Sequence, residues 1–255
     1  MITGVNSNTF QKLQLNEGVF LKAPYEGTLN AEDIVSATRG GATIAIVPTQ
    51  REIAIDGLRT HTKEALILDD FSVTASFVAV EYSKEVVKMA LGSADEVDNT
   101  ITPRHKILTA SDFVDLYWLG ELSDGRKVQI KFSNTYSTNG LNFKSTEKST
   151  GEITLNFTAF YSIDDQETPP VSIEYLSNEC VVTFDVTPSD ATIVVKDEEG
   201  VTVTATSEGV YTLTIGKYTY TISKTDYVTQ TVSVNITNLD AFTGTKTITV
   251  TLLAS

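Results

Sequence analysis

Residues 71–79 read FSVTASFVA, and this stretch decides the fold class because its apolar and polar side chains alternate almost strictly. Side chains on a β-strand point alternately to its two faces, so a period of two predicts a strand with one buried face. The same alternation returns in VQIKF at 128–132 and in ITLNFTA at 153–159. The first part of the chain is therefore predicted to be mainly β, with half-buried antiparallel strands.

One helix is expected among these strands. Residues 83–92 read SKEVVKMALG, with a serine to cap the helix, a glutamate in its first turn, one apolar face and a glycine to end it. A second short helical turn is expected at 111–116. Upstream, residues 43–56 are predicted to form two strands around Pro48, within a long hairpin that spans about residues 39–70 and has its exposed tip at 57–62.

A domain boundary is predicted at DDQETPP, residues 164–170, because this polar, acidic stretch ends in two prolines. The division gives one domain at 1–170 and a second at 171–255. The second segment alternates almost without pause and contains about seven short strands separated by turns. That spacing is typical of a small β-sandwich.

The whole chain is acidic. In 255 residues there are 19 Lys and Arg against 33 Asp and Glu, a net charge of −14. Residues 1–170 hold 15 of the cations and 23 of the acids, and residues 171–255 hold 4 and 10, so neither half conceals a basic excess. Proteins that grip nucleic acid use Lys and Arg to displace counterions from phosphates. The charge balance therefore argues against a protein held on DNA by phosphate contacts.

The number of cysteines and the length of the apolar segments indicate the cellular compartment. Cys180 is the only cysteine, so neither an intrachain disulfide nor a cysteine-based zinc site is expected. The first residues lack the pattern of a signal peptide, and no run of roughly 18 apolar residues occurs. We therefore expect a protein made in a cytoplasm, without membrane insertion.

The inventory of chemically active residues is thin. His61 and His105 each stand apart from any second histidine or suitably spaced carboxylate, and the phosphate-loop, nucleophile-elbow and dinucleotide-binding patterns do not occur. Neighbouring acids such as Asp69 and Asp70 point to opposite faces of a strand. The sequence therefore predicts no enzyme, no cofactor and no metal.

Several stretches of the first domain, taken in order, resemble the major tail tube protein of long non-contractile tailed bacteriophages, the siphophages. QKLQLNEGVFL at 11–21 resembles the N-terminal arm of that family, and REIAIDG at 51–57 with Lys63 resembles its long hairpin. Similar stretches follow at 81–91, 101–105, 112–120 and 139–141. The resemblance covers about residues 10–175, and it rests on order and spacing rather than on any one piece.

This resemblance implies a β-sandwich-like or barrel-like subunit with one flanking helix, in rings of six that stack into a tube for the genome. It implies other tail proteins as partners, such as the tape measure and the tail terminator, and a non-specific passage of double-stranded DNA. The protein would belong to the virion tail after assembly in the bacterial cytoplasm. An acidic wall repels phosphates, which is compatible with such a conduit.

The second domain, residues 171–255, resembles a bacterial immunoglobulin-like or PEGA-type module, as in GKYTYTISKTDY at 216–227. In a tail tube protein such a module would be an outward-facing decoration, dispensable for the tube. Its role would be either weak attachment to a cell envelope, for example by contact with surface glycans, or stabilisation of the coat of the tail. The alternative is a surface adhesin or carbohydrate-binding protein whose immunoglobulin-like part is the active one. That alternative calls for a signal peptide or a cell-wall anchor.

Two regions supply the candidate subunit contacts. The N-terminal arm is too apolar for a free tail, so we expect it to dock on a neighbouring copy. The hairpin has open strand edges, which proteins either protect or use to join neighbours. The LRTHTK tip at 58–63 departs from the family pattern. The candidate interface residues are Leu13, Leu15, Val19, Leu21, Ile53, Ile55, Arg59 and Lys63.

Overall fold

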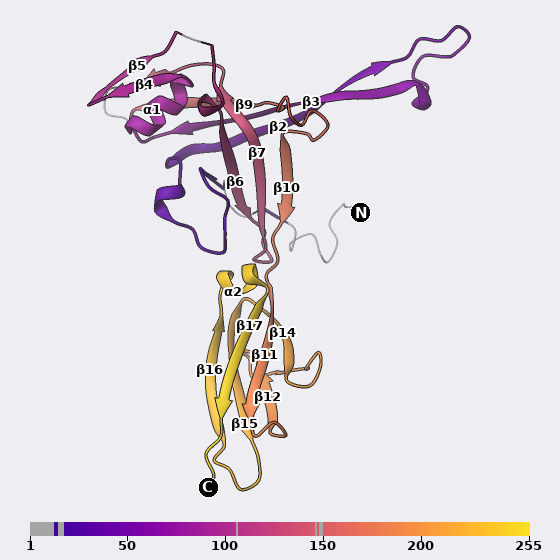
Figure 1. Ribbon diagram of the computed structural model, residues 1–255, viewed down its shortest axis with the longest axis vertical. Coiled ribbons are helices and arrows are strands. Elements are labelled where there is room, and N and C mark those ends of the chain that lie inside the picture. Colours follow the sequence, from indigo (N-terminus) through magenta and orange to yellow (C-terminus); the bar gives the residue numbers. More distant parts are fainter. Residues whose placement is uncertain (1–12, 15–17, 106, 146, 148–149) are drawn as a thin grey trace, which may run out of the picture.

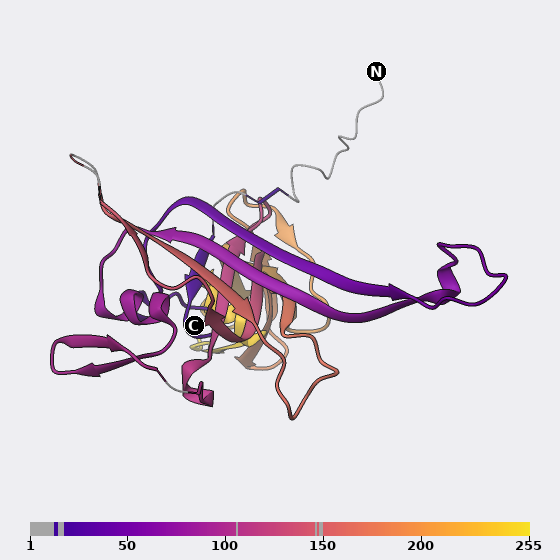
Figure 2. The same cartoon turned by 90° about the horizontal axis from the view of Figure 1, so that it is seen from above.

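The computed structural model describes residues 13–14, 18–105, 107–145, 147 and 150–255. The protein is mainly β, as predicted, and consists of two bodies arranged end to end (Figure 1). The larger body ends with strand β10, and the smaller one follows it. A long two-stranded hairpin leaves the larger body and extends well beyond it (Figure 2).

An eight-stranded antiparallel sheet builds the larger body. Its main order is β1-β6-β7-β9-β3-β2, while β8 pairs with β9 and β10 pairs with β7. The strands are β1 (Val19–Leu21), β2 (Thr38–Glu52), β3 (Leu66–Ala79), β6 (Val114–Glu121), β7 (Lys127–Ser137), β8 (Asn142–Lys144), β9 (Glu152–Ala159) and β10 (Val171–Tyr175).

The sheet curls around its core. Phe20 in β1 and Phe77 in β3 stack with ring centroids 4.1 Å apart, although β6, β7 and β9 lie between those two strands in the sheet. In a flat sheet, four strand spacings would separate them by about 19 Å. Strands β1 and β3 must therefore approach each other, which is consistent with the sandwich-like or barrel-like form that the resemblance implies. The alternating apolar side chains of β3, β7 and β9 line this core.

Helix α1 (Lys84–Leu91) packs on the core where the sequence predicted a helix. The Ser83 hydroxyl accepts a hydrogen bond from the N–H of Val86 (3.1 Å), and Gly92 ends the helix with φ +74°. Two short strands follow, β4 (Ala94–Val97) and β5 (Thr100–Pro103), and they pair with each other. At 111–116, where a second helical turn was expected, a 3-10 turn covers only Ala110–Asp112 and β6 begins at Val114.

The prediction of two strands around Pro48 was wrong. Strand β2 runs without a break from Thr38 to Glu52. Pro48 pairs with Phe71, and the N–H of Phe71 points away from β2, where it donates to the Tyr161 hydroxyl (3.0 Å). The N–H that proline lacks would therefore face outward from an edge strand, and the ladder between β2 and β3 loses nothing.

The smaller body is a sandwich of two sheets. One has the order β14-β11-β17 and the other β13-β12-β15-β16, and Phe184 of β11 contacts Tyr220 of β15 edge-on across the core. A short helix, α2 (Asn238–Thr243), was not predicted. The remaining elements are β11 (Glu179–Thr187), β12 (Thr192–Lys196), β13 (Thr202–Val203), β14 (Val210–Thr214), β15 (Gly216–Ser223), β16 (Gln230–Ile236) and β17 (Thr245–Thr251).

Strand β10 lies beyond the expected boundary at residue 170. Residues 171–175 pair with β7 of the larger body, and Leu176 is buried against Leu21, Tyr25 and Leu119. The two prolines at 169–170 therefore lead into a strand of the first sheet. The chain crosses to the smaller body only at Ser177 and Asn178, just before β11.

Candidate assembly surface

The apolar face of the first sheet continues onto the hairpin, beyond the point where the body covers it. Ile46 and Pro48 of β2 pair with Val73 and Phe71 on the core side. A β-bulge then shifts the register between Thr49 and Gln50.

Beyond the bulge, Gln50 pairs with Leu68 and Glu52 pairs with Leu66. Because side chains alternate along β2, positions 46, 48, 50 and 52 share one face, and the two leucines lie on that face with them. Leu66 is 52% exposed and Leu68 is 50% exposed. No described residue covers this part of the core face.

The tip of the hairpin is apolar at its base and charged beyond it. Ile53 donates its N–H to the Ala65 carbonyl (2.8 Å), which closes the ladder, and the His61 N–H donates to Glu52 (2.5 Å). Ile53, Ile55 and Leu58 are exposed.

The predicted contact residues of the hairpin thus lie on its surface. Arg59 and Lys63 are exposed, and Lys63 lies 3.4 Å from the carboxylate of its neighbour Glu64.

The predicted residues of the N-terminal arm divide into three groups. Leu13 is partly exposed, and its carbonyl accepts a hydrogen bond from Ser123 (2.7 Å) in the β6–β7 turn of the same chain. Val19 pairs with Leu119, and Leu21 is fully buried in its own subunit, so Leu21 offers no surface to a neighbour. Leu15 lies outside the described residues.

The outer edge of β10 is also open in the described part of the chain. Strand β10 pairs only with β7 there, and the hydrogen bonds at both ends join Pro170 to Ser133 and Leu176 to Lys127. Antiparallel bonding alternates along a strand, so residues 171, 173 and 175 direct their backbone groups away from β7. Two of their side chains, Ile173 and Tyr175, are exposed.

A groove of about 710 Å³ lies where the two bodies meet. Leu29 on one wall and Leu239 of α2 on the other are each about half exposed, and Leu119 and Gly120 lie between them. Glu121 and Lys127 add one charge of each sign. Burial, and then the negative charge of Glu121, raises the pKa of the nearby Tyr25 hydroxyl.

Contacts between the bodies fix the walls of this groove. Lys127 Nζ donates to Asn238 Oδ1 (3.0 Å), and Asn178 Nδ2 donates to the Asp124 carbonyl (3.4 Å). Gly27 has φ +85°, and a Cβ at this position would come within 2.7 Å of Leu239 Cα. The loop at Gly27 is therefore packed directly against α2.

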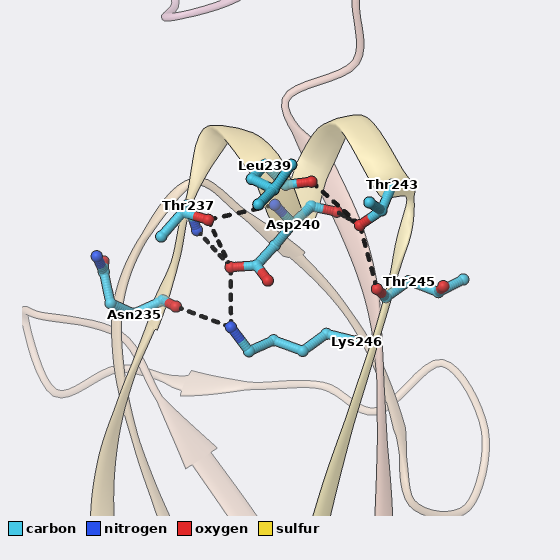
Figure 3. Close-up of polar contacts among 7 residues, drawn as sticks. All are labelled: Asn235, Thr237, Leu239, Asp240, Thr243, Thr245 and Lys246. Carbon is cyan, nitrogen blue, oxygen red and sulfur yellow. Dashed lines mark hydrogen bonds and ion pairs between the residues drawn. The ribbon is translucent and has the colours of Figure 1, made fainter. Parts of the chain in front are cut away.

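Helix α2 is itself held by the polar cluster of Figure 3. Asp240 Oδ2 accepts hydrogen bonds from the N–H and the hydroxyl of Thr237 and from Lys246 Nζ, each 2.8 Å long. Lys246 Nζ also donates to the Asn235 carbonyl (3.3 Å). Burial acts to raise the pKa of Asp240, but the bonds from Lys246 and Thr237 outweigh it and hold the pKa below its ordinary value.

Among the described residues, no three of His, Cys, Asp and Glu come together as a metal site. None of the helices in the described ranges has both the length and the apolar character needed to cross a bilayer. Cys180 is buried in the core of the smaller body, and burial, followed by the negative charge of Asp240, raises the pKa of its thiol.

No family model and no curated protein matches the sequence. Among solved structures, the chain is similar to one from the virion of a native gene transfer agent particle. The identity is 7% and the TM-score is 0.33, and the match covers 63% of this chain and 96% of that chain.

Proposed function

We propose that the protein is a structural subunit of a virion tail tube, which assembles with copies of itself into rings that stack. The uncovered core face of the hairpin, at Leu66 and Leu68, carries this proposal. A sheet face that continues past its own subunit gains stability only when a second molecule covers it. A hairpin that reaches away from the body brings such a face to a neighbouring copy (Figure 2).

In the fuller form of the proposal the tube is of the siphophage type, with six subunits in a ring and double-stranded DNA passing through. Its partners are other tail proteins, such as the tape measure and the terminator, and assembly takes place in the bacterial cytoplasm. The net charge of −14 supports a conduit role, because acidic walls repel phosphates and leave DNA free to slide. The smaller body faces outward, since it would obstruct the bore.

The alternative of a carbohydrate-binding protein has less support. Sugar sites commonly use exposed aromatic faces, but Tyr211, Tyr218 and Tyr220 of the smaller body are each less than 10% exposed. Their rings pack in the core of the sandwich, where Tyr211 donates its hydroxyl to the Ile193 carbonyl (3.1 Å). A glycan contact by residues 171–255 would therefore have to use other side chains.

Electron microscopy of the purified chain in negative stain tests the proposal, and we expect hollow tubes or rings. The variant that carries both Leu66→Thr and Leu68→Thr removes the uncovered apolar surface but keeps side chains suited to a strand. Because both leucines are half exposed, the thermal midpoint should stay within a few degrees of the parent value. Tubes should disappear.

Val201→Thr is the matched control, because Val201 is 61% exposed but lies between β12 and β13 of the smaller body. The smaller body lies far from the hairpin (Figure 1). Val201→Thr should change neither the thermal midpoint nor the tubes. If the parent protein stays monomeric at high concentration, or if the double leucine variant forms normal tubes, the proposal fails.

A further inference from the structure

We infer that the groove between the two bodies receives the hairpin tip of a second copy of this chain. The inference rests on the proposed self-assembly and names the two surfaces that meet. The groove has two half-exposed leucines in its lining, Leu29 and Leu239. A cleft of about 710 Å³, lined by both apolar and polar residues, has room for several aliphatic side chains.

The hairpin tip presents side chains that match this cleft. Ile53, Ile55 and Leu58 are all exposed within six residues, and Ile55 is 61% exposed. The tip lies at the free end of the hairpin, far from α2 of the same chain (Figure 1). The tip and the groove can therefore meet only between two molecules.

Charges at the two surfaces also correspond. The tip carries Asp56 and Arg59, and neither side chain forms a hydrogen bond or an ion pair with another described residue. The groove offers Glu121 to Arg59 and Lys127 to Asp56. Docking would pair these charges while the isoleucines lose contact with water.

The other large pocket is less suitable. It measures about 520 Å³ and lies beside α1, but its carboxylates already have partners: Glu96 pairs with Lys84 and Lys88, and Asp112 with Arg104. The tip would form few new charge pairs there, because each of these acids is already paired within its own chain.

Cross-linking tests the contact directly. The variant with both Ile55→Cys and Leu239→Cys places one new thiol on the tip and one in the groove, while the native Cys180 is buried. Under mild oxidation at assembling concentrations, we expect a ladder of disulfide-linked oligomers. Each single variant should give no ladder, because one new thiol per chain cannot extend a series.

A charge exchange gives a second readout without cysteines. Arg59→Glu alone and Glu121→Arg alone should each lower the yield of tubes at least about tenfold, because like charges then face each other. The variant with both changes should regain most of the yield. Recovery would require the two residues to meet, which a general loss of folding does not produce.

The outcomes separate the two proposals. Tubes without a ladder, and with no effect of the charge changes, would overturn the docking and leave self-assembly standing. A parent chain that shows neither tubes nor a ladder would overturn both. A ladder without tubes would support the docking but contradict the tail tube.

Discussion

At the scale of single residues, Asp240 helps to hold α2, one wall of the groove, in place. It caps α2 through Thr237 and ties the helix to β17 through Lys246 (Figure 3). Its pKa lies below the ordinary value, so the folded protein holds this proton less tightly than the unfolded chain. The carboxylate therefore adds stability above its unfolded pKa of about 3.9, and the contribution is lost as the pH falls through the lower folded pKa.

Replacing Asp240→Asn keeps an acceptor oxygen but removes the charge. At pH 7 we expect the free energy of unfolding of the smaller body to fall by about 1–2 kcal/mol, because the charge-assisted bond from Lys246 is lost. At low pH the difference should shrink, because the parent carboxyl becomes protonated as the pH falls through its lowered pKa. Urea unfolding followed by far-ultraviolet circular dichroism measures both values.

Asp190→Asn is the control for this experiment. Asp190 pairs with Lys224 in the same body, but its side chain is 71% exposed, and exposed pairs contribute little. Trp118 is the only tryptophan and lies in the larger body, so its fluorescence should respond to neither change. An equal loss for Asp190→Asn would remove any special role for Asp240.

At the scale of elements, the contact between the Gly27 loop and α2 decides whether the two bodies move as one. We expect Gly27→Val to separate them, because its Cβ would come within 2.7 Å of the Leu239 backbone and 2.9 Å of Phe242 Cβ. Small-angle scattering should then show a larger radius of gyration, and proteases should cut faster at Ser177 and Asn178.

Gly57→Val provides the matched control. Gly57 has nearly the same positive φ (+87°), but no atom lies within 4 Å of the Cβ position. Backbone strain of about 1–2 kcal/mol is common to both variants, whereas the clash with α2 occurs only in the first. If both variants leave scattering and proteolysis unchanged, the Gly27 contact does not hold the bodies together.

Many of the strands, and helix α1, could be predicted from the sequence. Alternation located β3, β7 and β9, and a capping serine with a terminal glycine located α1. Helix α2 was missed because it has only six residues, although the TNLD capping box at 237–240 was a usable signal. Pro48 suggested a break between two strands, and Pro170 suggested a domain boundary. In the structure, Pro48 lies within an edge strand and Pro170 directly precedes β10.

The candidate site was less predictable than the fold. The exposed tip holds Ile53, Ile55, Arg59 and Lys63, as expected for a hairpin. The local sequence pattern is enough to locate such a tip. Leu21 is buried because it faces a second small cluster with Tyr25, Leu119 and Leu176. The groove has walls from residues near 29, 120 and 239, and only tertiary packing brings such distant segments together.

At the scale of the whole molecule, the apolar tip and the groove are two different surfaces of one chain. A contact between unlike surfaces is heterologous, so each copy that binds one neighbour still offers its other surface to the next. Such a contact closes into a ring or continues as a filament. A tube of stacked rings is consistent with this geometry, and it requires both surfaces to be present on every subunit.

Truncation tests that requirement. A chain ending at Ser177 keeps β10 and the buried Leu176 but loses α2, one wall of the groove. We expect it to fold, as judged by Trp118 fluorescence, and to form narrower tubes only at concentrations raised about tenfold, since part of each contact is missing. A chain ending at Pro169 also loses β10 and exposes the edge of β7 and the cluster around Leu21, so it should aggregate. If the chain ending at Ser177 forms tubes at the parent concentration, assembly does not need the Leu239 wall. The smaller body would then be only an appendage of the tube.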